Sequence, residues 1–116
     1  MTDAIVYVHE LDKLEDQLQT CQTYCGLYDL RIVECTVGDR AHAIAEARRR
    51  SAVLVTTTIT NLGDTVQAVA KAAAIVDVVS IREGIDSTTA MGRLVMNVLT
   101  TVHQYYIETG DNDANQ

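Results

Sequence analysis

The stretch VVSIREGIDSTTAMGRLV, residues 78–95, decides how the chain folds. Its β-branched start predicts a buried strand, and the run Gly84–Ser87 predicts a loop. The hydroxyl residues that follow can cap the N-terminus of a helix, and we expect Ser87 to act as that cap rather than as a nucleophile. We expect the helix to span about residues 88–107, which gives a length of about 30 Å.

The predicted helix carries apolar residues over an arc of roughly 140°, which is wider than packing against one surface requires. These residues are Met91, Leu94, Val95, Val98, Leu99, Val102, Tyr105 and Tyr106. Met96 and Ile107 lie outside that arc. We therefore expect the helix to pack on its own domain and on a partner, in a homodimer that pairs two such helices across a two-fold axis.

The rest of the chain alternates apolar runs with helical patterns. Strands are expected over residues 4–8, 31–36, 52–59 and 76–81, and helices over 13–24, 39–48 and 65–75, with Gly26 as a C-cap and Asp39 as an N-cap. This alternation predicts a three-layer α/β domain with a mostly parallel, four- to five-stranded sheet flanked by helices. We expect the domain to cover residues 1–110 and residues 111–116 to form a disordered, acidic and polar tail.

The charge balance bears on the partners. The chain has 116 residues, a formal net charge of −7 and two lysines, Lys13 and Lys71. Because nucleic-acid binding relies on cations that neutralise phosphates, we expect no direct DNA binding by the isolated chain. Few lysines and many acids suit either a salt-rich cytoplasm or a GC-rich genome, and both remain open.

The same composition bears on the compartment and on cofactors. No apolar run approaches the roughly 18 residues of a membrane span, and no signal-peptide layout is present, so we expect a cytoplasmic protein without membrane association. Cys21 and Cys25 lie one turn apart, a spacing more typical of a helix core than of a metal site. We expect no metal and no cofactor.

The stretch at residues 78–95 resembles the end of the catalytic domain of serine recombinases, the resolvase/invertase family. In that family a last strand, a "G-I-D-(S/T)" loop and an "(A/E)-M-G-(K/R)" start lead into a long dimerisation helix. The matching residues are Gly84, Ile85, Asp86, Ser87, Met91, Gly92, Arg93 and Val95. The resemblance implies a resolvase-like catalytic-domain fold with a long C-terminal helix.

The opening motif of the family, "Y-x-R-V-S", supplies the serine that attacks a DNA phosphate, and a helix with "L-x-x-Q" follows it. Here Tyr7 and Gln17 match, whereas His9 stands at the arginine position and Leu11 at the serine position. Leucine has no nucleophilic atom, so no covalent intermediate can form there.

A second family motif, "D-R-(L/F)-x-R", supplies arginines that neutralise the phosphate undergoing transfer. Here Asn61 replaces the first arginine, the second has no counterpart, and Asp64 adds a negative charge. Arg40 matches an arginine that opens a helix in the family. The resemblance therefore implies a degenerate site at Tyr7, His9, Leu11, Gln17, Arg40 and Asn61.

We predict a catalytically inactive interaction or regulatory module, which forms a homodimer or a heterodimer with an active recombinase. Two alternatives stay open: phosphoryl transfer with a relocated nucleophile, and an anion sensor that uses Arg40 and the turn at Asn61 at a helix N-terminus. The run Arg48–Arg50 can complement a helix C-terminus or contact phosphate.

Overall fold

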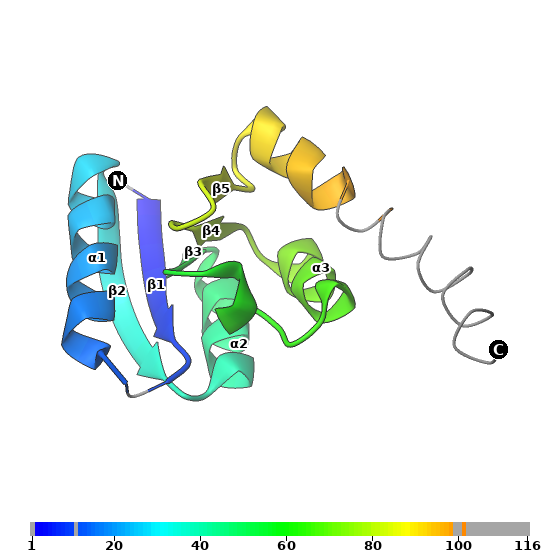
Figure 1. Cartoon of the computed structure of the whole chain (residues 1–116). Helices are drawn as coiled ribbons and strands as arrows, with labels where there is room; N and C mark the ends of the chain where they lie inside the picture. Colours follow the sequence, from blue (N-terminus) through cyan, green and yellow to red (C-terminus); the bar gives the residue numbers. More distant parts are fainter. Residues whose placement is uncertain (1, 11, 99–100, 102–116) are drawn as a thin grey trace, which may run out of the picture.

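The computed structural model describes residues 2–10, 12–98 and 101, and Figure 1 shows the path of the chain. The elements, in order, are β1 (Thr2–Val8), α1 (Leu14–Leu27), β2 (Leu30–Val37), α2 (Arg40–Arg50), β3 (Val53–Thr56), the 3-10 turn η1 (Ile59–Asn61), α3 (Val66–Ile75), β4 (Val78–Ser80) and β5 (Ile85–Asp86). A further helix follows over residues 90–98.

The five strands form one sheet in the order β2-β1-β3-β4-β5. The first four strands run parallel, and β5 runs antiparallel to β4. The predicted mostly parallel sheet is confirmed, with β3 at its centre. The loop predicted at Gly84–Ser87 contains the short strand β5. The chain turns just before it, where Gly84 adopts a left-handed φ of 69° and its N–H donates to the carbonyl of Ile81. That hairpin turns the chain back along β4.

Alternation along the strands gives the sheet two apolar faces. Ala4, Val6 and Val8 point toward α1, where Cys21 and Cys25 are buried. The alternate residues Ile5 and Tyr7 belong to the core under α2 and α3, with the residues Ala43, Ala47, Leu54, Leu62, Val69, Val78 and Met96. Figure 1 shows α1 on one side of the sheet and α2 and α3 on the other, so the predicted three layers are confirmed.

Three sequence-based assignments of element ends are wrong. Gly26 lies inside α1, and the chain leaves that helix through Asp29 with a φ of 58°. The third strand ends at Thr56 rather than Ile59, because Thr58 already leads into the 3-10 turn that starts at Ile59. The fourth strand is confined to Val78–Ser80.

The cap of the helix at residues 90–98 also differs from the prediction. Ser87 Oγ accepts a hydrogen bond from the N–H of Val78 at 2.7 Å, so it fixes the chain to β4 instead of capping. Thr89 is the cap, because its Oγ1 accepts from the N–H of Gly92 at 2.9 Å. The caps at Asp39 and Thr65 are observed as well.

The predicted long helix is seen over residues 90–98. Leu99, Val102, Tyr105 and Tyr106, together with the predicted tail at 111–116, lie outside the described residues. In the described part of the chain, no helix has the length and apolar character to cross a bilayer.

The three cysteines differ in accessibility, which yields a first prediction. Cys21 and Cys25 are on the buried face of α1, whereas Cys35 is exposed on the edge strand β2. Burial raises the pKa of Cys21 to about 12, so its reactive thiolate is scarce at neutral pH. We expect iodoacetamide at pH 8 to modify Cys35 in the folded protein, and all three cysteines after denaturation. Peptide mass spectrometry would measure this, and fast labelling of Cys21 in the folded protein would contradict the packing.

Candidate functional site

The residues singled out from the sequence meet at the carboxyl edge of the parallel strands. Tyr7 lies at the end of β1 and is followed by His9, and Asn61 lies in the turn after β3. Arg40 opens α2, and Gln17 lies in the first turns of α1. This edge is where parallel α/β sheets carry their binding and catalytic groups. Leu11 lies outside the described residues.

Tyr7 and His9 form the first pair of the site. The Tyr7 hydroxyl is hydrogen-bonded to His9 Nδ1 at 2.7 Å, and the Tyr7 side chain is fully buried. Burial raises the pKa of the Tyr7 phenol, while the nearby Arg40 guanidinium opposes that rise. The phenol is therefore neutral at physiological pH, and its hydrogen bond to the imidazole of His9 fixes its position.

Arg40 is directed at atoms of the protein itself. Its Nε donates to the backbone carbonyl of Asn61 at 2.8 Å, and its Nη2 lies 3.6 Å from a carboxylate oxygen of Asp64. The Nη2 atom is buried and has no hydrogen-bond acceptor in the described structure. Arg40 thus fastens the start of α2 to the turn between η1 and α3.

A chain of neutral hydrogen bonds runs across the same edge. Asn61 Nδ2 donates to the hydroxyls of Thr56 at 2.9 Å and Thr57 at 3.2 Å. Thr57 donates to Gln17 Oε1 at 3.3 Å, and Thr56 donates to the Tyr7 carbonyl at 2.7 Å. Gln17 Nε2 in turn donates to the Asp12 carbonyl at 2.8 Å. Amide and hydroxyl groups therefore link β1, β3, η1 and α1.

Glu83 is a participant that sequence reasoning missed. Its Oε1 accepts from the N–H of Ile59 at 3.0 Å and from the Ser80 hydroxyl. This carboxylate ties the loop after β3 to the turn after β4. Its only sequence signal is an acid in the turn that precedes Gly84, because the contact depends on two loops that meet in three dimensions.

We call this group of side chains the polar cluster; it consists of Tyr7, His9, Gln17, Arg40, Thr56, Thr57, Asn61, Asp64 and Glu83. The cluster has little positive charge with which to attract a phosphate. Arg40 brings a positive charge, while Asp64 and Glu83 bring two negative charges. In the described ranges, no three His, Cys, Asp or Glu side chains converge in a way that could hold a metal ion.

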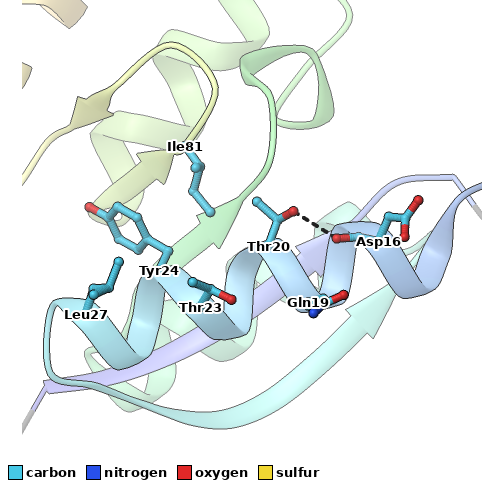
Figure 2. Close-up of a pocket in the computed structure, with 7 residues that line it drawn as sticks. All are labelled: Asp16, Gln19, Thr20, Thr23, Tyr24, Leu27 and Ile81. Carbon is cyan, nitrogen blue, oxygen red and sulfur yellow. Dashed lines mark hydrogen bonds between the residues drawn. The ribbon is translucent and has the colours of Figure 1, made fainter.

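A second feature lies on the α1 face of the sheet. A hollow of about 520 Å³ lies between α1 and Ile81. Figure 2 shows the residues that line it on the helix, which are Asp16, Gln19, Thr20, Thr23, Tyr24 and Leu27. An adjoining hollow of about 310 Å³ shares Tyr24 and Ile81 and reaches Met91 and Val95. We call the two hollows together the α1 trough.

The predicted interface residues that the structure describes lie on or beside the α1 trough. Met91 is 70% exposed, Leu94 55% and Val98 53%, while Val95 is half-buried. Met91 and Val95 line the trough, and exposed Leu27 faces it from α1. The helix at residues 90–98 therefore presents apolar side chains to solvent next to an open apolar surface.

Solved structures share this architecture. The catalytic domain of the TP901-1 integrase aligns with a TM-score of 0.79 and 15% identity, over 93% of this chain and 98% of that domain. The C-terminal catalytic domain of ISC1926 TnpA, an IS607-like serine recombinase, aligns with a TM-score of 0.54 and 15% identity, over 92% of this chain and 84% of that one. No family model matches the sequence, and no curated protein matches it. The chain has the fold of a serine recombinase catalytic domain.

Proposed function

We propose that this chain, which has the fold of a serine recombinase catalytic domain, is a non-catalytic module that works by association with a second copy or with an active recombinase. The observation that supports the proposal is the composition of the polar cluster. Leucine occupies the sequence position of the nucleophile, and neutral side chains bond one another where a phosphate would need cations.

The electrostatic argument concerns the transition state of phosphoryl transfer. Catalysis of that step consists largely of stabilising charge on phosphate oxygens with preorganised cations and donors. Arg40 already donates to the Asn61 carbonyl and lies near Asp64, whose carboxylate would repel a phosphate. The same repulsion argues against an anion sensor at Arg40.

The association argument starts from charge. Residues 94–107 contain no Asp, Glu, Lys or Arg, although 25 of the 116 residues of the chain are of those types. Two copies that each carry a net charge of −7 repel one another, so contact through an uncharged surface is favoured. Leu94 and Val98 expose apolar area at the start of that segment, and covering such area supplies a driving force for association.

The α1 trough offers a surface for the same segment of a second copy. It lies beside the helix at residues 90–98, so a two-fold axis near that helix would bring each trough next to the other copy's segment. Asp16 and Asp86 are the charged residues that line it. A recombinase with a similar helix could occupy the same surface and would then be paired with a subunit that lacks a nucleophile.

The catalytic half of the proposal predicts that no covalent protein–DNA adduct forms. The purified chain would be incubated with supercoiled plasmid and stopped with denaturant, beside an active serine recombinase on its own site as a positive control. We expect no adduct and no nicking from the wild type or from Leu11→Ser, because a restored hydroxyl still lacks the phosphate-neutralising arginines.

Either adduct would be informative. An adduct with the wild type would overturn the non-catalytic assignment and point to a relocated nucleophile. An adduct with Leu11→Ser alone would show that the site can still stabilise the charge on the phosphate in the transition state. That result would contradict our interpretation of the polar cluster.

A further inference from the structure

A third surface lies between α2 and α3 on the opposite face of the sheet from the α1 trough. It is a shallow hollow of about 620 Å³, lined by Ala41, Ile44, Ala45, Arg48, Arg49 and Ile75. Ile75 is 49% exposed, and Ile44 is half-buried. The hollow, which we call the α2–α3 groove, therefore has an apolar floor open to solvent.

The rim of the α2–α3 groove is positively charged on an acidic chain. Arg48, Arg49 and Arg50 are three of the nine basic residues, and they follow one another in the last turn of α2. Glu46 pairs with Arg49 at 2.7 Å and with Arg50 at 3.1 Å, and these two arginines hold the pKa of Glu46 to about 2. Glu46 thus pairs with two of the three guanidinium groups, and the Glu34 carboxylate also acts on Arg49, which leaves the rim with a surplus of one positive charge.

Arg48 has no ion-pair or side-chain hydrogen-bond partner among the described residues. Basic residues in the last turn complement a helix dipole, which explains their sign. The dipole does not explain why they border the half-buried Ile44 and the exposed Ile75. An apolar floor with a surplus of positive charge suits an acidic segment that carries an aliphatic side chain.

The geometry points to one such segment in this chain, residues 107–113, as the occupant of the α2–α3 groove. It contains Ile107, Glu108, Asp111 and Asp113 and no basic residue. This inference goes beyond association through the helix, because it uses a different face of the protein and residues outside the arc assigned to the partner.

The position of Met96 supports the assignment. Met96 lies outside that arc and is buried with the core under α2 and α3. Ile107 comes eleven residues later and, like Met96, lies outside that arc. Met96 and Asn97 share a hollow with Ala73 and Ala74, the residues just before Ile75.

Consecutive residues of α3 connect the two surfaces, because Ala73 and Ala74 line the hollow at Met96 and Ile75 lines the α2–α3 groove. Ile107 lies ten positions after Asn97, and a chain of that length reaches at most about 35 Å when extended. Docking would cover the arginine-rich end of α2 with the acids of the same chain. That end would then be shielded from polyanions until salt or a competing acidic partner releases the segment.

Methyl NMR of the full chain tests the inference directly. We expect nuclear Overhauser contacts between the Ile107 methyls and those of Ile44 or Ile75 in low salt. We expect their loss at about 1 M salt, where the Debye length falls to about 3 Å. Arg48→Glu should abolish the contacts, and combining it with Glu108→Lys and Asp111→Lys should restore them.

The matched control is Arg82→Glu, which makes the same charge change at an exposed arginine outside the groove and should leave the contacts in place. Absence of any Ile107 contact with Ile44 or Ile75 in low-salt wild type would overturn the inference. Contacts seen only between differently labelled copies would overturn docking within one chain. The salt series on the wild type decides the matter even if a variant folds poorly.

Discussion

Replacing Gly92 with alanine should lower the free energy of unfolding by about 3 kcal/mol, at the upper end of the range for overpacking in a core. A Cβ added at Gly92 would overlap the backbone carbonyl of Asp86. Asp86 cannot retreat easily, because it pairs with Val79 in the sheet and the next N–H, that of Ser87, bonds the carbonyl of Val78 at 2.9 Å. The start of the helix would have to move instead.

The change would be measured by denaturant unfolding and by the drop in Tm, which we expect to be about 10 °C or more. Gly26→Ala is the matched control. Gly26 lies inside α1 with nothing within 4 Å of an added Cβ, so alanine should stabilise the protein by about 0.5–1 kcal/mol. Equal stability of the wild type and Gly92→Ala would contradict the close approach of helix and strand.

The second large effect concerns association. Val98→Asp should convert a dimer into a monomer without loss of fold, because Val98 is 53% exposed and its charge would be buried only in the complex. Leu94→Asp should do the same for the same reason, since Leu94 is 55% exposed. Sedimentation velocity would give the mass distribution, and thermal unfolding would show that each variant is folded.

Asn97→Asp supplies the matched control for this experiment. It introduces the same charge one residue earlier, on the side that lines a hollow with α3 rather than the α1 trough. We expect it to leave the mass unchanged. A dimer that survives both Val98→Asp and Leu94→Asp would place the interface elsewhere on the protein.

The parts of the fold that local pattern determines could be predicted from the sequence. The continuous apolar run in β1 and the β-branched run in β3 identify central strands, because such residues are stable only when both sheet faces are covered. Asp39 was recognisable as a cap, because it precedes a helical pattern with an acceptor side chain in place, whereas Thr65 was expected inside its helix and caps it instead.

The missed features depend on contacts between segments. Thr89 rather than Ser87 caps the helix because Ser87 is engaged by the N–H of Val78, a bond that exists only once β4 and β5 pair. Glu83 joined the polar cluster for a similar reason, since its partner Ile59 lies 24 residues earlier in the chain. No local pattern distinguishes these residues from their neighbours.

The membership of the polar cluster was predictable only in part, because Thr56, Thr57 and Glu83 were not identified, and its bonding was not predictable. Tyr7, His9, Gln17, Arg40 and Asn61 were identified by resemblance, and the structure brings them to one edge of the sheet. Arg40 bonds the carbonyl of Asn61 instead of facing solvent. This contact depends on the direction of the side chain, which spacing in the sequence does not specify.

The measurement that tests the central claim most directly is the molar mass of the wild type by light scattering, in low salt and at about 2 M KCl, where charge repulsion is screened. The proposal predicts twice the monomer mass at micromolar concentration, with screening strengthening the association of two acidic chains. A monomer mass in both conditions, up to high micromolar concentration, would contradict self-association through the helix.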